Sequence, residues 1–425
     1  MSASNSDFHG VAPTPSARRI PPLVPWYAAH SMAGFMSPLI INAAYFFSTY
    51  ELHQPAQVQL AMAAGGGAIY TLSAIFGGRW VDRIGPRRMA TFMTLACIPI
   101  ALLGAAAAFY RSLWALVLLI LLLNLTTGAL WPSIESALTR CPGKLRLTSR
   151  ITLYNISWSS TSFVASCVVG SMALGLTWPG VFITAAVLSA AACLIITFFS
   201  IPQAQMPPGH IEDSPQEQLR TKAILASPRS HTLLHMAWMS NMLSYVAANT
   251  VLPIMPTITV LLGIKSYAVA TAIGSIWALA RIAGFLLTTF WTGWHYRLSW
   301  MMIAFGALLV GTVSLLLSPS IVILVLSQIL FGLAVALLYS GSLYYAMHLG
   351  SGSGANAGIH EALIGVGTVV GPGLAAVIGP PDAVEPKALA IFLILGLGGG
   401  AMAFMARRLR GLAAMSLQME RNAHV

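Results

Sequence analysis

The chain contains 425 residues, of which 57% are hydrophobic and only 8% are charged. Soluble globular proteins carry about 25% charged residues, so 22 basic and 11 acidic side chains cannot coat the surfaces of the two or three soluble domains that this length would form. Together with a mean hydropathy of +0.78, this composition excludes water-soluble and disordered proteins and predicts an integral membrane protein.

The apolar residues form twelve long stretches separated by shorter polar segments. A membrane-spanning helix needs about 20 predominantly apolar residues, whereas a barrel strand shows about ten residues of alternating polarity. We therefore predict an all-α polytopic membrane protein with twelve transmembrane helices. In chain order, the predicted spans are 23–47, 57–78, 89–109, 113–138, 151–175, 178–200, 231–255, 267–293, 298–317, 321–346, 357–379 and 388–406.

The longest polar stretch between spans divides the chain into two sets of six helices. It runs from residue 201 to 230, contains five prolines, and is typical of a cytoplasmic linker. The similar spacing of the two sets indicates two pseudo-symmetric bundles, an arrangement found in transporters with a solute site near the midplane. The predicted segments are an N-tail (1–22), a first bundle (23–200), the linker (201–230), a second bundle (231–406) and a C-tail (407–425).

The basic residues are distributed unevenly between the two sides of the predicted membrane. If the N-terminus is cytoplasmic, the cytoplasmic segments contain 18 of the 22 basic residues, and the outer loops contain only Arg111, Lys265 and Lys387. This bias follows the positive-inside rule. It accounts for the net charge of +11 and the pI near 9.8 without a nucleic-acid partner. We expect both termini in the cytoplasm and favour the inner membrane of a bacterium.

The loop after the second span carries a short motif of glycine, acidic and basic residues. Asp82 can accept hydrogen bonds from a helix N-terminus, where partial positive charge collects, and Gly85 permits a turn that most residues resist. In the alternative interpretation, the basic cluster only fixes the topology. The residues of the motif are Gly78, Asp82, Arg83, Gly85, Arg87 and Arg88, with Pro86 before the basic pair.

The motif resembles the G-x-x-x-D-R-x-G-[R/K]-[R/K] signature of the major facilitator superfamily, and the resemblance covers nearly the whole chain. It implies a secondary transporter that moves a small organic solute by alternating access. It also implies that the loop is a latch that closes the cytoplasmic side in the outward-open state. A drug or metabolite efflux transporter is the first alternative, and a membrane-embedded enzyme or transport-dead receptor is a remote one.

Three charged residues lie within the predicted spans, where ionisable groups are costly and mark functional positions. Glu135 either binds a proton or the substrate, or pairs with Arg83 or Arg150 near the motif. Arg281 either binds an anionic group of the substrate or pairs with a protein carboxylate. Glu361 either caps the start of its helix, where the helix dipole favours a carboxylate, or couples protons together with His360.

The resemblance also implies that the first, fourth, seventh and tenth spans line a central cavity. Four polar residues of the seventh span share one helix face, because they are spaced by three, four and four positions. Hydrogen bonding between helices is the alternative role for any one of these residues. The candidate cavity residues are His30, Asn42, Tyr45, Asn124, Trp131, Trp238, Asn241, Tyr245, Asn249, Gln328 and Tyr339.

The sequence carries no pattern for catalysis or for a bound cofactor. His231 and His235 lie four residues apart, but no third metal ligand is apparent, and the four cysteines form no C-x-x-C pair. We therefore expect no metal, no cofactor and no catalytic residues. The expected partners are the lipid bilayer and a small-molecule substrate, with a proton or substrate gradient as the energy source, and the expected state is a monomer.

Overall fold

A computed structural model describes residues 21–141, 145, 147–201, 228–291, 293–295, 297–349, 354–381 and 383–423. Within these residues, all regular secondary structure is helical. The helices are α1 (Val24–Tyr50), α2 (Ala56–Ile84), α3 (Pro86–Phe109), α4 (Leu113–Arg140), α5 (Leu147–Phe199), α7 (Pro228–Leu261), α8 (Tyr267–Gly274), α9 (Ile276–Phe290), α10 (Leu298–Leu316), α11 (Ile321–Leu349), α12 (Gly354–Val377) and α13 (Glu385–Ala423).

The predicted spans coincide largely with these helices. In the described part of the chain, ten helical segments are long and apolar enough to cross a membrane. One of them, Ser149–Phe199, covers two predicted spans, which meet at a kink at Thr177 (φ 61°). The all-α membrane fold is therefore confirmed, whereas the number of twelve crossings stays a prediction.

The predicted eighth span is not one continuous helix. It is interrupted at Ser275, which separates α8 from α9. Gln328 of α11 compensates for the break, since its side chain donates to the carbonyl of Ile273 (3.0 Å) and accepts from the N–H of Trp277 (3.3 Å). A break in a membrane helix is tolerated where a neighbouring side chain bonds the freed backbone groups in this way.

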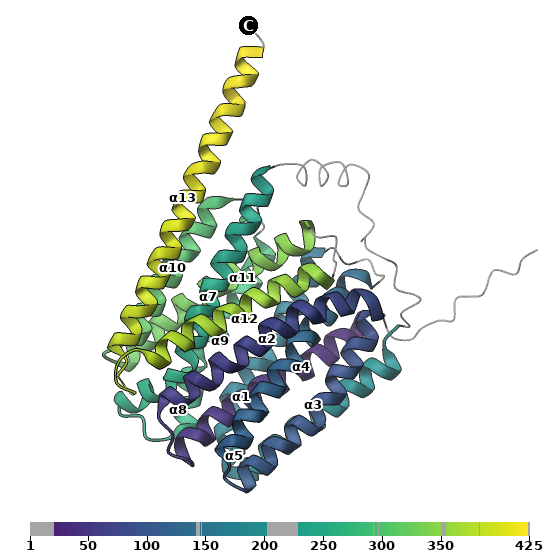
Figure 1. Cartoon of the computed structure of the whole chain (residues 1–425), viewed down its shortest axis with the longest axis vertical. Coiled ribbons are helices and arrows are strands. Elements are labelled where there is room, and N and C mark those ends of the chain that lie inside the picture. Colours follow the sequence, from purple (N-terminus) through teal and green to yellow (C-terminus); the bar gives the residue numbers. More distant parts are fainter. Residues whose placement is uncertain are drawn as a thin grey trace, which may run out of the picture.

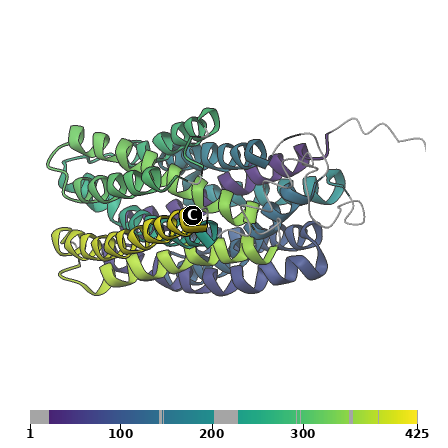
Figure 2. The same cartoon turned by 90° about the horizontal axis from the view of Figure 1, so that it is seen from above.

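Helices α1 to α5 and α7 to α13 form two groups, which we call the first and second halves. Each half has its own apolar core, built around residues such as Phe182 in the first and Phe331 in the second. The halves meet where α2 packs along α12, and where α5 packs against α8 and α9 (Figure 1). Figure 2 looks from the end at which α13 leaves the bundle.

The contact between α2 and α12 depends on a residue without a side chain. A Cβ atom at Gly358 of α12 would lie 2.6 Å from the carbonyl oxygen of Ala74 and 3.1 Å from the Cα atom of Gly78 on α2. Both distances are shorter than ordinary van der Waals contact. Glycine at this position therefore lets the two halves approach at backbone distance.

We call the end of the bundle that contains Asp82 and the start of α12 the motif end. The opposite end contains Glu51 and Arg111, which form an ion pair of 3.4 Å. α13 continues as a helix into the predicted C-tail as far as Ala423 and extends beyond the other helices (Figure 1). Most of the predicted N-tail (1–20) and linker (202–227) lies outside the described residues.

Candidate functional site: a cavity between the two halves

A cavity of about 220 Å³ lies between the halves. Its walls come from α1, α2, α4 and α5 of the first half and from α7, α11 and α12 of the second. The wall includes aromatic rings, the amides of Asn124 and Asn249, and several hydroxyl side chains. Cavities with this position between two packed halves are typical binding sites for small molecules.

Seven of the eleven predicted cavity residues line this space, and four do not. Those on the wall are His30, Tyr45, Asn124, Trp131, Tyr245, Asn249 and Tyr339. Asn42, Trp238, Asn241 and Gln328 do not line it in this conformation. Asn42 instead bonds within the first half, to the carbonyl of Pro38 (2.8 Å) and the hydroxyl of Ser166 (3.2 Å).

The other three residues lie elsewhere in the second half. Trp238 and Asn241 lie one to two turns closer to the motif end than Tyr245, and Trp238 packs against the apolar core of the second half. The Asn241 amide is buried and has no hydrogen-bond partner among the described residues. Gln328 of α11 bridges the break between α8 and α9.

The predicted set omitted α2, α5 and α12, which also contribute to the wall. Tyr70, Tyr154, Trp158 and Thr368 line the cavity, as does Glu361. The run of hydroxyl and aromatic residues at the start of α5 was a detectable signal. Part of that run contacts α1, where Ser157 bonds His30 (2.7 Å) and the hydroxyl of Ser162 donates to the Gly34 carbonyl (3.0 Å). Tyr154, Trp158 and Ser162 line the cavity.

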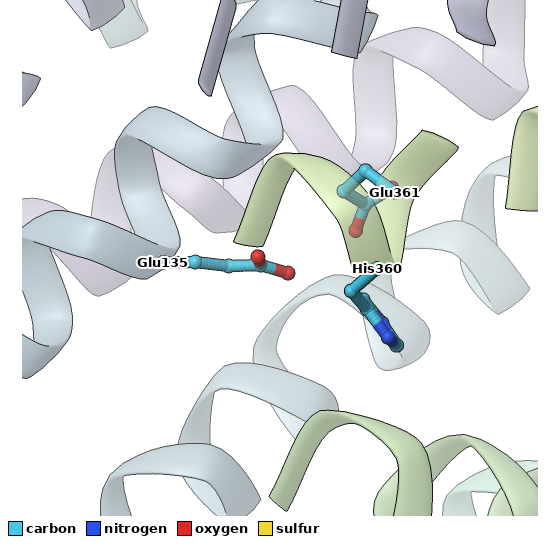
Figure 3. A group of neighbouring side chains, drawn as sticks. All are labelled: Glu135, His360 and Glu361. Atoms are coloured by element: carbon cyan, nitrogen blue, oxygen red, sulfur yellow. The ribbon is translucent and has the colours of Figure 1, made fainter. Parts of the chain in front are cut away.

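The two buried glutamates come together across the boundary between the halves. Glu135 extends from α4 toward α12, and the Glu361 carboxyl group turns toward it (Figure 3). The two side chains lie within hydrogen-bonding reach of each other. Their solvent-exposed fractions are 0% and 3%. From the sequence, Glu135 and Glu361 were predicted as two independent sites. Their pairing is the main feature of the site that was not predicted.

Each glutamate also receives a hydrogen bond from a tyrosine. Tyr154 of α5 donates to Oε1 of Glu135 (3.0 Å), and Tyr70 of α2 donates to Oε2 of Glu361. The Tyr70 bond connects the two halves. Within the described residues, the ion pairs are Arg111 with Glu51 and Arg140 with Asp82, so neither member of the glutamate pair forms an ion pair with a lysine or arginine.

These contacts correct two alternatives. Glu135 does not pair with Arg150, whose guanidinium donates to the carbonyls of Leu138 and Cys141 (2.7 and 2.6 Å). It does not pair with Arg83 either, which is exposed. Glu361 does not cap its helix, because it lies seven residues after Gly354, beyond the first turn in which the dipole acts.

His360 completes a small cluster with the two glutamates. One ligating atom from each of Glu135, His360 and Glu361 lies within 4.8 Å of the others. A structural zinc site uses four protein ligands, and the described residues supply three here. The cluster is therefore better suited to a proton than to a structural metal ion.

Arg281 of α9 is buried without a carboxylate. It is 5% exposed, and its guanidinium carbon lies over the rings of Trp158 (4.4 Å) and Trp277 (4.6 Å). No acidic residue in the described part of the chain lies within 4.0 Å of it. Pairing with a protein carboxylate, one of the two sequence-based alternatives, is therefore wrong for this conformation.

The motif loop joins the two halves at the motif end. Asp82 forms an ion pair with Arg140 of α4, and its Oδ2 atom accepts a hydrogen bond from the backbone N–H of Ala355 (3.1 Å). Ala355 is the second residue of α12, so Asp82 contacts a helix N-terminus of the second half. The same end is held by the hydroxyl of Thr289 on α9, which donates to Thr152 on α5 (2.9 Å).

The other motif residues act within the first half. Gly85 has φ +90° and ψ 148° between α2 and α3, in a region that favours glycine. The Arg87 guanidinium donates to the carbonyls of Ile196 and Thr197 near the end of α5. Arg83 and Arg88 are exposed.

Comparisons with known proteins agree with this arrangement. The profile of the Major Facilitator Superfamily matches residues 26–372. The chain belongs to this superfamily. Superfamily membership and the two-half fold with a central cavity identify a secondary transporter, as the sequence motif predicted.

Two crystal structures of superfamily transporters share the fold. One is a peptide transporter of the POT type in complex with sulfate, with a TM-score of 0.70 and 15% identity over 91% of this chain and 94% of that chain. The other is a POT-family transporter in complex with a thioalcohol-conjugated peptide, with a TM-score of 0.70 and 12% identity over 91% and 96%. At these identities, the similarity concerns the fold alone.

A sequence relative matches over a shorter segment. The multidrug resistance protein MdtG of Serratia proteamaculans (strain 568) is 31% identical over 122 residues. This match spans 28% of this chain and 28% of MdtG.

Proposed function

We propose that this transporter couples the movement of a small organic solute to the movement of protons, and that the Glu135–Glu361 pair holds the coupling proton. The observation that carries the proposal is the contact between two buried carboxyl groups, one from each half, beside the cavity. Glu361 also lines the cavity, so proton and solute occupy neighbouring positions.

The need for a proton follows from electrostatics. Two adjacent carboxylates cannot both be charged without a compensating cation, and the described residues offer no lysine or arginine side chain to this pair. Oε2 of Glu135 is buried and receives no hydrogen bond from the described residues. A proton shared with Glu361 would supply the missing donor and remove one negative charge.

The location of the pair between the halves would link proton binding to conformational change. In alternating access, the halves rock against each other and open the cavity first to one side and then to the other. Separation of α4 from α12 would break the contact between the two carboxyl groups and expose them to water. The proton would then be released on the side to which the cavity opens.

The cavity favours a small solute over a bulky one. Its volume of about 220 Å³ is below the range of about 300–1,000 Å³ that is typical of sites for drug-sized ligands. Aromatic rings and the amides of Asn124 and Asn249 suit a ligand with a flat or apolar body and a few polar groups. Efflux of drugs is the second candidate, and the local similarity to a multidrug resistance protein favours it.

We also propose that the motif end is cytoplasmic and that the protein works as a monomer in a bacterial inner membrane. The excess of basic residues in the segments near Asp82 supports this orientation, and the bacterial relative supports the location. In this orientation, the Asp82–Ala355 contact would be the cytoplasmic latch, and both termini would lie in the cytoplasm. One chain supplies all the walls of the cavity, which supports a functional monomer.

The shared proton can be tested before the solute is known. Infrared difference spectra of the purified protein between acidic and alkaline buffer should contain the C=O band of a buried protonated carboxyl group. Glu361→Gln and Glu135→Gln should each remove it, whereas Glu51→Gln, which changes an acid at the opposite end, should not. A band that is unchanged in both cavity variants would contradict the proposal, and displacement of the band by added Zn²⁺ would assign the cluster to a metal instead.

A further inference from the structure

Arg281 is a buried cation whose hydrogen-bond donors are unused. Within the described residues, the guanidinium forms no ion pair, and its buried Nε atom has no hydrogen-bond partner. A guanidinium carries five N–H donors, and leaving a buried charged group without acceptors is strongly unfavourable. The surroundings of Arg281 are therefore incomplete in this conformation.

The neighbouring tryptophans do not replace an acceptor. Trp158 and Trp277 present indole rings to the guanidinium at 4.4 and 4.6 Å, which stabilises the positive charge through cation–π attraction. Indole has no lone-pair acceptor for an N–H group. The charge is thus held in place by aromatic rings, while the N–H groups at its edge remain available to an anion.

The cavity is separated from this cation by one layer of side chains. Trp158, whose ring lies against the guanidinium, lines the cavity, and so do Tyr339, which packs beside Trp158, and Tyr245, which packs beside Tyr339. Trp158 comes from the first half and Arg281 from the second, so this contact changes when the halves move. A small shift of the Trp158 side chain would open Arg281 to a ligand in the cavity.

We propose that Arg281 binds a carboxylate group of the transported solute, and that the solute is therefore a small organic anion. This inference rests on the proposed function, because it takes the central cavity as the solute site. A guanidinium matches a carboxylate with two parallel hydrogen bonds. One guanidinium balances one negative charge, and the cavity wall itself contains no lysine or arginine, so a monocarboxylate fits better than a dianion such as phosphate.

The solute anion and the proton would bind together. Glu361 lines the same cavity, and a charged carboxylate there would repel an organic anion. A proton on the Glu135–Glu361 pair removes this repulsion. The two sites therefore predict cotransport of an organic anion with a proton, with Trp158 contributing an aromatic surface for the body of the solute.

Binding in the absence of any gradient tests the anion site separately from proton coupling. We would measure the thermal stabilisation and the tryptophan fluorescence of the purified protein with benzoate, phenylacetate and 3-phenylpropionate, each compared with its neutral amide at constant ionic strength. The wild-type protein should prefer at least one carboxylate over its amide by about tenfold or more, since a hydrogen-bonded ion pair is lost with the amide. Chloride alone should not reproduce the effect.

Three variants assign the preference to Arg281. Arg281→Gln should abolish it, and Arg281→Lys should retain only part of it, because a lysine cannot bind a carboxylate in the bidentate manner. Arg111→Gln, at the exposed opposite end, should leave it unchanged. If Arg281→Gln does not fold, the partial loss in Arg281→Lys still provides the test.

Any one of three results would overturn the anion site. The protein could show no preference for a carboxylate over its amide in the whole panel, or chloride could stabilise it as much as the carboxylates do. The preference could also remain undiminished in Arg281→Lys and Arg281→Gln. Failure of proton coupling would look different. In that case, the carboxylate preference and its dependence on Arg281 would persist, but a pH gradient would not drive uptake into proteoliposomes.

Discussion

Asp82 of α2 accepts a hydrogen bond from the backbone N–H of Ala355 at the start of α12, 273 residues further along the chain. One carboxylate thus connects the first half to a helix N-terminus of the second half. Arg140 pairs with the same carboxylate and fixes it from within the first half. This contact lies at the motif end, where α5 and α9 are also joined by the Thr289–Thr152 hydrogen bond.

Removing this connection should favour conformations that are open at the motif end. Asp82→Ala deletes a side-chain acceptor at a helix N-terminus, and comparable losses cost about 1 kcal/mol. We expect faster labelling by a maleimide of Ser342→Cys, a buried position beside His360 at the motif end. Glu51→Ala removes an ion pair that lies within the first half and serves as the control. Equal labelling rates in Asp82→Ala and the parent would contradict the latch.

Thr152 and Thr289 offer a second connection between the halves that can be made permanent. Their hydroxyl groups are 2.9 Å apart, on α5 and α9. The double variant Thr152→Cys/Thr289→Cys should form a disulfide under oxidation and stop transport, and reduction should restore it. Each single variant is a control for oxidation of the native cysteines. Full transport in the cross-linked protein would show that this contact need not open.

The glycine at 358 should be intolerant of even one methyl group. Gly358→Ala places a Cβ atom 2.6 Å from the Ala74 carbonyl oxygen, and overpacking of this kind typically costs about 1–3 kcal/mol. We expect a lower melting temperature and weaker closure at the motif end. Gly306→Ala is the matched control, since a Cβ atom there would meet nothing within 4 Å. Equal melting temperatures of the two variants would contradict the tight α2–α12 contact.

If the Glu135–Glu361 pair holds the coupling proton, its loss should abolish accumulation of solute against a gradient but spare the exchange of solute across the membrane. With a solute identified by thermal stabilisation, Glu361→Gln should lose uptake driven by a pH gradient but keep solute counterflow, because counterflow requires only that the halves rock. Tyr70→Phe, which removes the hydrogen bond to Glu361, should weaken gradient-driven uptake without abolishing it. Uphill uptake that survives in both Glu361→Gln and Glu135→Gln would exclude the pair as the coupling site.

The sequence predicted the helices well because the bilayer imposes a length and a polarity on each span. It also located the motif loop, since Asp82 and Gly85 combine charge and turn chemistry in a short segment. It could not predict the Glu135–Glu361 contact, which joins α4 to α12 and depends on how the halves dock. Helical periodicity likewise placed Trp238 and Tyr245 on one face of α7, but only the docking decides which of them reaches the cavity.

The interruption at Ser275 has a consequence for how the opposite end of the bundle can move. Gln328 bonds the backbone on both sides of the break, so the eight residues of α8 are attached to α9 without a continuous helical ladder. A change in the angle of α8 therefore leaves Arg281 and Trp277 of α9 undisturbed. The part of this predicted span nearest the opposite end can therefore tilt while the guanidinium of Arg281 stays between Trp158 and Trp277, so that movement and charge placement are divided between two short helices.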